Sequence, residues 1–177
     1  MIVGRFVGVD ALAAVGSTGN LTNLVVNFYV GLSTGASVVI AQYYGAHNKD
    51  KIHQAVHTSY MLAIVSGIIM MLFGLFFSYQ CLDAIGVPHD ILNDASLYMR
   101  LYFLGMIPGA IYNIGSGILR AVGDSKRPLY YLIICSIVNV VFDFVLVVIL
   151  HKGIAGAAIA TFIAQTVCAI LVTIQLM

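Results

Sequence analysis

One carboxylate and one amide stand inside an apolar run in the second half of the chain. The run 138–150 reads VNVVFDFVLVVIL, and Asn139 and Asp143 are its polar members. Side chains four residues apart lie on one face of an α-helix, one turn apart, so the two form a polar patch. An ionised aspartate near the centre of a bilayer costs about 2.5 to 3.5 kcal/mol on insertion scales. The carboxylate must therefore be protonated or meet a compensating group.

Such a patch is suited to ion coupling. A carboxylate that gains and loses a cation inside a helix bundle links ion binding to the arrangement of the surrounding helices. Carboxylate, amide and hydroxyl oxygens are also ligands that an alkali cation accepts. The sequence leaves H⁺ and Na⁺ open as the coupling ion and predicts no other cofactor. The alternative is that Asp143 is protonated and hydrogen-bonded between helices, where it fixes their register.

A hydroxyl is expected beside this patch because of a tight turn, HKG, at 151–153. Asp143 precedes Lys152 by nine residues and Thr161 follows it by nine. At 1.5 Å per residue, both lie about 13 Å from the turn in antiparallel helices. Thr161 is therefore the third predicted member of the ion-coupling site. Five further polar residues are predicted to line a substrate cavity: Asn27, Thr34, Tyr112, Asn113 and Ser116.

The composition indicates the elements that must position these residues. Of 177 residues, 61% are hydrophobic and 8% are charged, and the mean hydropathy of +1.02 exceeds what a water-soluble domain buries. The sequence predicts an all-α, polytopic transmembrane helix bundle that forms a single domain over residues 1–177. Residues 1–8 read as the end of a preceding span. Five runs are long enough to cross a bilayer: 13–44, 56–77, 92–119, 129–150 and 154–177.

Charge in the connections predicts the topology. Lys49 and Lys51 mark one loop and Arg120, Lys126 and Arg127 mark another, so loops 46–53 and 119–128 are predicted to be cytoplasmic. Loops 79–95 and 151–153 then face outward. We expect a multi-pass protein of a bacterial inner membrane, with the lipid bilayer as a partner. The net charge of +1 gives no reason to expect a nucleic-acid partner.

Proline and small residues predict how the spans bend and pack. Pro108 lacks a backbone N–H and is expected to kink the span 92–119. Pairs of small residues at helical spacing let helix backbones approach closely in lipid. These pairs are Gly31 with Gly35, Gly105 with Gly109, Gly153 with Ala157, and Gly156 with Ala160.

Other reactive residue types predict no further chemistry. The spacing of Cys81, Cys135 and Cys168 matches no metal or redox motif, so they are interpreted as small core residues. His53 and His57 have a metal-ligand spacing, but the chain contains no glutamate and the pair is expected at the membrane interface. No metal site is predicted. No histidine within a later span can act as base for Ser116, so the chain is not expected to be an enzyme.

Five stretches resemble the N-terminal lobe of multidrug and toxic compound extrusion (MATE) transporters. They are VGRFVGVDALAAVG at 3–16, GLSTGASVVIAQYYGA at 31–46, YMRL at 98–101, LRAVGDSKRP at 119–128 and NVVFD at 139–143. The resemblance covers essentially the whole chain. Its most specific parts are LRAVGDSKRP, similar to the family's loop between its fourth and fifth spans, and the N-x-x-x-D pair on the fifth span.

The resemblance implies half of a twelve-helix antiporter that exports organic, often cationic, compounds in exchange for H⁺ or Na⁺. Asn139 and Asp143 match the family's polar pair in the N-lobe cavity, and Thr161 matches a sixth-span hydroxyl. The family's first-span aspartate lies before the start of this chain. The implied partners are an organic cation or other small-molecule substrate and the missing C-terminal lobe.

Two alternatives remain open. A flippase of the same superfamily for lipid-linked oligosaccharides would need cationic cavity residues, and Arg100, which is peripheral, is the one candidate. A channel formed by several copies of a short chain would pass steady currents without a coupled counter-ion.

Overall fold

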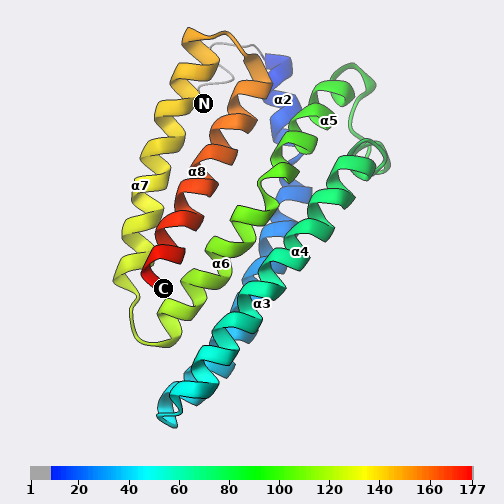
Figure 1. The fold of residues 1–177 in the computed structure, drawn as a ribbon. Helices are drawn as coiled ribbons and strands as arrows, with labels where there is room; N and C mark the ends of the chain where they lie inside the picture. The colour runs from blue at the N-terminus through cyan, green and yellow to red at the C-terminus, as the bar shows by residue number, and fades with distance from the viewer. Residues whose placement is uncertain (1–8, 177) are drawn as a thin grey trace.

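The computed structural model describes residues 9–176, and over this range every regular element is a helix. Figure 1 shows their arrangement. In chain order the helices are α2 (Val9–Ser17), α3 (Gly19–Gly45), α4 (Lys49–Ala84), α5 (His89–Leu104), α6 (Met106–Ala121), α7 (Lys126–Asp143), the π-helix η1 (Phe144–Ile149) and α8 (Gly153–Leu176).

Five membrane spans are confirmed, counting a bent pair as one. Four helical segments of the described chain are long and apolar enough to cross a membrane, and the pair α5 and α6 makes a fifth. The predicted start of the span 13–44 was wrong. The helix is interrupted at Thr18, residues up to Ser17 belong to α2, and the span begins with α3 at Gly19. The prediction that residues 1–8 end a preceding span falls outside the described residues.

The predicted kink is present between α5 and α6, whose axes differ by 51°. The break is at Gly105, three residues before Pro108. Proline cannot donate to the carbonyl four residues earlier, and its ring crowds that carbonyl. That carbonyl belongs to Leu104, the last residue of α5. The position of the proline therefore explains where the helix ends.

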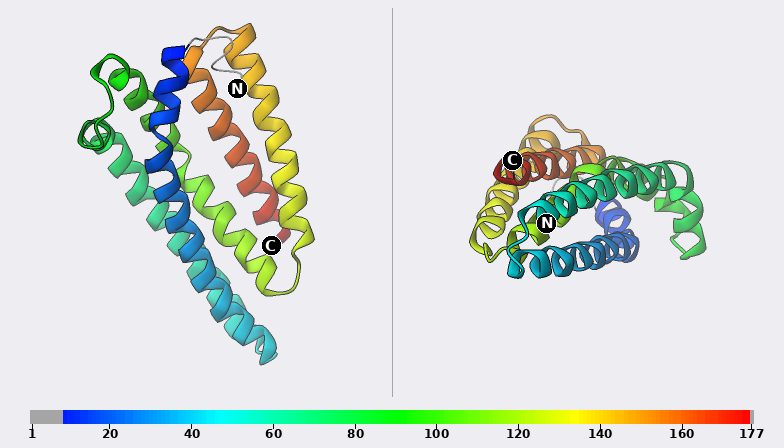
Figure 2. Two further views of the ribbon diagram at one scale, coloured as in Figure 1. Left: turned by 180° about the vertical axis from the view of Figure 1, so that it is seen from behind. Right: turned by 60° about the horizontal axis from the view of Figure 1, so that its bottom comes forward.

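Helix α6 lies in the middle of the bundle, between α3, α4 and α8. Ile114 and Ile118 of α6 are buried. Helix α7 packs mainly against α8, and large apolar side chains on α3, α4 and α7 are exposed, as expected for surfaces that face lipid. The two views of Figure 2 show α3 and α4 as a long hairpin that extends past the other helices.

The two basic loops lie at the same end of the bundle, as the topology prediction requires. In Figure 1 the α3–α4 and α6–α7 connections lie at the bottom, and the α4–α5 and η1–α8 connections lie at the top. The side of the membrane to which each end belongs stays a prediction.

Small residues make some of the expected close contacts. A Cβ on Gly156 would lie 3.1 Å from the backbone of Leu146, so the start of α8 packs directly on η1. Gly31 and Gly35 differ, because a Cβ on either would meet nothing within 4 Å. Their side of α3 is open rather than packed against a helix of the described chain.

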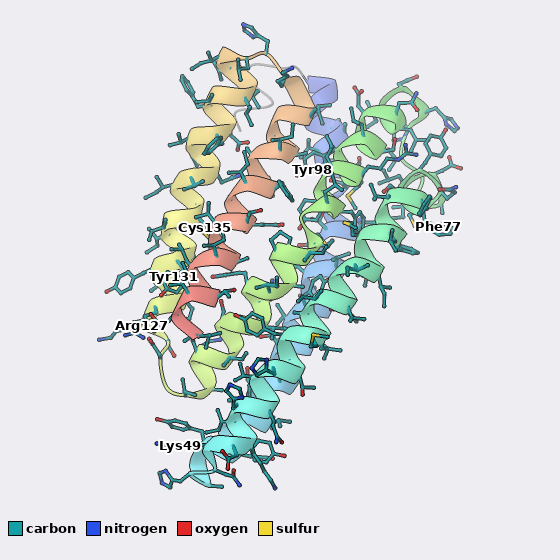
Figure 3. All side chains as sticks on the ribbon, in the orientation of Figure 1. Lys49, Phe77, Tyr98, Arg127, Tyr131 and Cys135 are labelled. Carbon is teal, nitrogen blue, oxygen red and sulfur yellow. A yellow bond between two sulfur atoms is a disulfide. The ribbon has the colours of Figure 1, made fainter. Side chains whose placement is uncertain are left out.

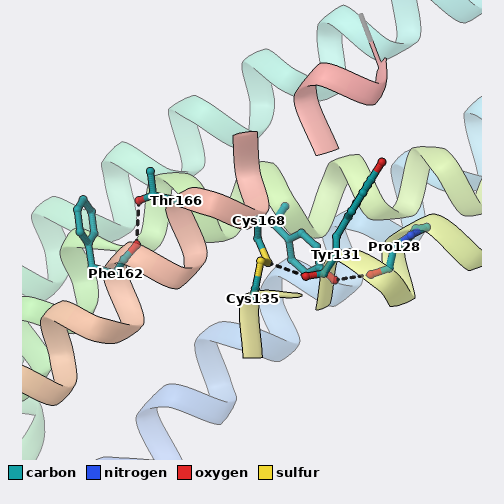
Figure 4. Close-up of a disulfide and its surroundings, with 7 residues drawn as sticks. Pro128, Tyr131, Cys135, Phe162, Thr166 and Cys168 are labelled. Atoms are coloured by element: carbon teal, nitrogen blue, oxygen red, sulfur yellow. Dashed lines mark hydrogen bonds between the residues drawn. A yellow bond between two sulfur atoms is a disulfide. The ribbon is translucent and has the colours of Figure 1, made fainter. Parts of the chain in front are cut away.

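Cys135 and Cys168 are buried core residues, as interpreted, but the interpretation missed that they are paired. Cys135 of α7 and Cys168 of α8 form a disulfide, with Cα atoms 5.9 Å apart (Figure 4). The antiparallel register of α7 and α8 brings together residues separated by 33 positions. Spacing along the chain carries no signal of such a pairing. Cys81 is a free thiol.

The pairing predicts how many thiols react with a maleimide. Within this chain, the denatured and unreduced protein should be labelled at Cys81 alone, and after reduction at Cys81, Cys135 and Cys168. Peptide mass mapping assigns each label to its cysteine. The Cys81→Ser variant is the control and should gain no label at any cysteine of this chain before reduction. Full labelling of the unreduced protein would show that Cys135 and Cys168 are not bonded.

Candidate ion-coupling site

Helices α7 and α8 bring the predicted amide and hydroxyl together. Asn139 Nδ2 donates to Thr161 Oγ1 across the two helices at 3.5 Å. The Thr161 hydroxyl in turn donates to the Ala157 carbonyl of its own helix at 3.0 Å. Both side chains are partly buried. The threonine is therefore oriented by its own helix and offers its oxygen to the amide.

The sequence spacing placed Thr161 at the depth of Asp143, but the structure pairs it with a residue one turn earlier on α7. Thr161 bonds Asn139, which lies four residues before Asp143. Directly after Asp143 the helix widens into η1. A π-helix places more residues in each turn than an α-helix, so six residues of η1 cover less of the helix axis than the α-helical rise assumes. Asp143 consequently lies nearer to the turn than the spacing predicts.

Asp143 presents an unpaired acceptor at the end of α7. Its Oδ1 atom is buried and has no hydrogen-bond partner among the described residues. Tyr98 lies on α5, the first half of the bent span. Figure 3 places Tyr98 in the half of the bundle away from Lys49 and Arg127. Because a buried polar atom without a partner is costly, this oxygen is suited to receive a proton or a metal cation.

Gln165 is a polar residue near this site that the sequence reasoning missed. It lies one turn after Thr161 on α8, and its Oε1 atom is also buried without a described partner. A Cβ on Gly105 would overlap this oxygen, and a Cβ on Gly109 would lie 3.4 Å from it. The amide thus fills space that two glycines leave at the α5–α6 bend. Its spacing of four from Thr161 was the signal that could have found it.

Three of the predicted cavity residues lie on α6. Tyr112 donates its hydroxyl to the Pro128 carbonyl at 3.3 Å, which joins α6 to the start of α7. Asn113 donates to the Gly109 carbonyl at 2.8 Å, within the bent span. Ser116 is 2% exposed, and its hydroxyl has no partner among the described residues. These side chains belong to the helix that separates α8 from α3.

The other two predicted cavity residues lie on α3, which packs on α6 and α4. Asn27 is exposed and lines a groove between α3 and α4. Thr34 is exposed and its hydroxyl donates to the Val30 carbonyl of its own helix at 2.8 Å. Neither residue lines the α7–α8 contact that holds Asn139 and Thr161.

Comparison with known proteins identifies the family. The family model described as MatE matches residues 1–145. The chain is 34% identical over 167 residues to the probable multidrug resistance protein YoeA of Bacillus subtilis, covering 92% of this chain and 36% of that protein. It is 25% identical over 167 residues to the probable multidrug resistance protein NorM of Thermotoga maritima, and the match covers 92% of this chain and 36% of that protein.

Solved structures similar to this chain belong to the same family. A structure described as the inward-facing conformation of a multidrug resistance MATE family transporter has a TM-score of 0.93 and 27% identity, with 99% of this chain and 40% of that chain covered. A structure described as the outward-facing conformation of a multidrug resistance MATE family transporter has a TM-score of 0.92 and 27% identity. The match covers 99% of this chain and 39% of that chain.

The chain spans less than half the length of the relatives it matches. The match, the helical fold and the five spans agree with one another. This chain is a multi-pass membrane protein that belongs to the MatE family of transporters.

Proposed function

We propose that this chain is the N-terminal lobe of a secondary antiporter that exports drugs or organic cations across a bacterial inner membrane in exchange for H⁺ or Na⁺. The observation that carries the proposal is the buried Oδ1 oxygen of Asp143, which has no hydrogen-bond partner among residues 9–176 and lies one turn from the Asn139–Thr161 pair. The names of the relatives, which describe multidrug resistance, support the substrate class.

The mechanism follows from competition for one negative charge. When Asp143 is ionised, an organic cation neutralises it, and Asn139 and Thr161 supply oxygen or amide contacts beside it. When a proton or Na⁺ takes that position, the organic cation loses its counter-charge and leaves. Exchange is therefore obligatory as long as the carboxylate holds one partner at a time.

The lobe is expected to move as a unit during this exchange. The described helices match an inward-facing and an outward-facing structure almost equally well, with TM-scores of 0.93 and 0.92. A lobe that rearranged internally would match one of the two states better. Rocking of one such bundle against another around a midplane site is a common design of secondary transporters.

Dye transport in inverted membrane vesicles tests the proposal. Vesicles from cells that carry the complete gene are loaded with a fluorescent organic cation under a proton gradient, a sodium gradient, both or neither. We expect accumulation with one of the two gradients and its collapse with the matching ionophore. Equal accumulation without any gradient, or steady ion currents without dye movement, would reject an antiporter.

Thr161→Val should weaken substrate binding more than it lowers the maximal rate. The change removes a hydroxyl that the mechanism places beside the bound cation, and the loss of one such contact, about 0.5 to 1.5 kcal/mol, corresponds to a rise in KM of roughly two- to tenfold. Thr166→Val is the matched control, because Thr166 makes the same kind of bond to its own helix, to the Phe162 carbonyl at 2.8 Å. Dye transport measured at several concentrations separates KM from rate. Equal effects of the two variants would contradict a role for Thr161 in the site.

A further inference from the structure

A second hollow lies away from the ion-coupling site, between α3 and α4. Its volume is about 880 Å³, and its described lining residues all come from these two helices. One part of the lining is apolar or small and includes Gly31, Gly35, Ala36 and Leu62. The open sides of Gly31 and Gly35 form part of this groove, which explains why a Cβ on either glycine would meet no neighbour.

The charge of the groove favours an anionic ligand. Among the described lining residues Lys51 is the charged one, and none is a carboxylate. Its ammonium group lies 5.5 Å from the centre of the Tyr43 ring, which also lines the groove. Gln54, a neutral donor, follows Lys51 by three residues along α4, whereas the Thr58 hydroxyl donates to the Gln54 carbonyl at 2.9 Å. An organic cation of the kind that Asp143 would attract is repelled here.

The length of α4 places the two ends of the groove in different surroundings. Helix α4 has 36 residues, about 54 Å at 1.5 Å per residue, whereas the hydrocarbon core is about 30 Å thick. Lys51 lies in the first turn of α4, at the tip of the hairpin that extends past the bundle, and is exposed. Leu62 lies about 16 Å further along the helix. One groove thus runs from the polar interface toward the hydrocarbon.

We propose that this groove binds an anionic phospholipid of the cytoplasmic leaflet. The phosphate lies at Lys51, with the Gln54 amide as a neutral donor, and an acyl chain lies along Gly31 and Gly35. Basic pockets between transmembrane helices on the cytoplasmic side are suited to acidic headgroups, and loop 46–53 is predicted to be on that side. A lipid matches both ends of the groove, whereas free phosphate matches only the mouth.

Native mass spectrometry of the protein expressed from the complete gene tests the site. The purified protein is mixed with phosphatidylglycerol or phosphatidylcholine of the same chain lengths. We expect several-fold more retained phosphatidylglycerol, and this preference should fall to near parity in Lys51→Gln. Gly35→Leu fills the apolar part and should reduce the retention of both lipids. Its side chain enters open space, so the fold is expected to persist, which a melting curve checks.

Two variants separate the groove from the general charge of the hairpin. Lys49→Gln removes a nearby charge that does not line the groove, and Gly45→Leu adds the same bulk at another open glycine. Both should behave like the unchanged protein. Equal loss of preference in Lys49→Gln and Lys51→Gln would overturn the proposal, as would unchanged lipid retention in Gly35→Leu. Unchanged lipid retention in Gly35→Leu is the result expected if the second lobe covers the groove. Lipid retention is read out without transport, so the test is independent of the antiport mechanism.

Discussion

Replacing Asp143 with asparagine should reduce ion-driven dye transport to the level of vesicles that lack the protein. Asparagine keeps the size of the side chain and one acceptor oxygen, but it carries no charge to exchange between an ion and an organic cation. Because the Oδ1 atom of Asp143 has no described hydrogen-bond partner, no known bond is broken by the change. The measurement is dye accumulation under the driving gradient, at matched protein levels.

The same variant separates coupling from a structural role. If Asp143 were a protonated residue that fixes helix register, its replacement should lower the melting temperature together with transport. If it is a coupling group, stability should stay the same or rise, because an ionised aspartate costs about 2.5 to 3.5 kcal/mol within the bilayer. Asp83→Asn is the control, because the same chemical change is made at an exposed carboxylate near the end of α4. Normal transport by Asp143→Asn would remove this carboxylate from the mechanism.

Gly74→Ala should give the largest loss of stability among single-methyl additions to the described bundle. A Cβ at Gly74 would overlap the Phe103 ring at the base of its side chain, where α4 packs on α5. Overpacking of a buried contact costs about 1 to 3 kcal/mol, and more when neither backbone can shift. Both residues are buried, so we expect a clearly lower melting temperature in detergent or a loss of folded protein.

A second substitution tests whether this contact is the cause. Phe103→Leu makes room for the added methyl group, so the double variant should be more stable than the sum of the single changes predicts. Gly35→Ala is the matched control, because its Cβ meets nothing within 4 Å. Two results would show that the α4–α5 contact does not cause the loss of stability. One is strict additivity of the effects of Gly74→Ala and Phe103→Leu, and the other is an equal loss of stability in Gly35→Ala.

The sequence predicted the spans well, because span length and apolar composition follow directly from the thickness of the bilayer. It also predicted the bend near Pro108, because a missing N–H acts within its own helix. The residue at which the first full span begins was predicted less well. The break at Thr18 lies within GSTGN at 16–20, a cluster of small and polar residues typical of turns, and the prediction took this cluster as part of the span.

Contacts between helices were harder to predict, because they depend on register. Thr161 bonds Asn139 rather than Asp143, the widening of the helix after Asp143 accounts for part of this offset, and no local sequence signal marks a π-helix in this run. The same register determines the Cys135–Cys168 disulfide. The spacing of four from Thr161 could have indicated Gln165, but the contact of its amide with Gly105 depends on the bend of another helix. Each of these features depends on two segments at once.

The central claim is that one carboxylate exchanges an ion for substrate, and ion-dependent ligand binding to the purified protein tests it most directly. Binding of a fluorescent organic cation is measured over a range of pH at fixed Na⁺, and over a range of Na⁺ at fixed pH. Acid or sodium should weaken binding to the unchanged protein, because either ion neutralises Asp143. Asp143→Asn should bind the dye weakly and with no dependence on that ion. The same ion dependence in Asp143→Asn as in the unchanged protein would contradict it.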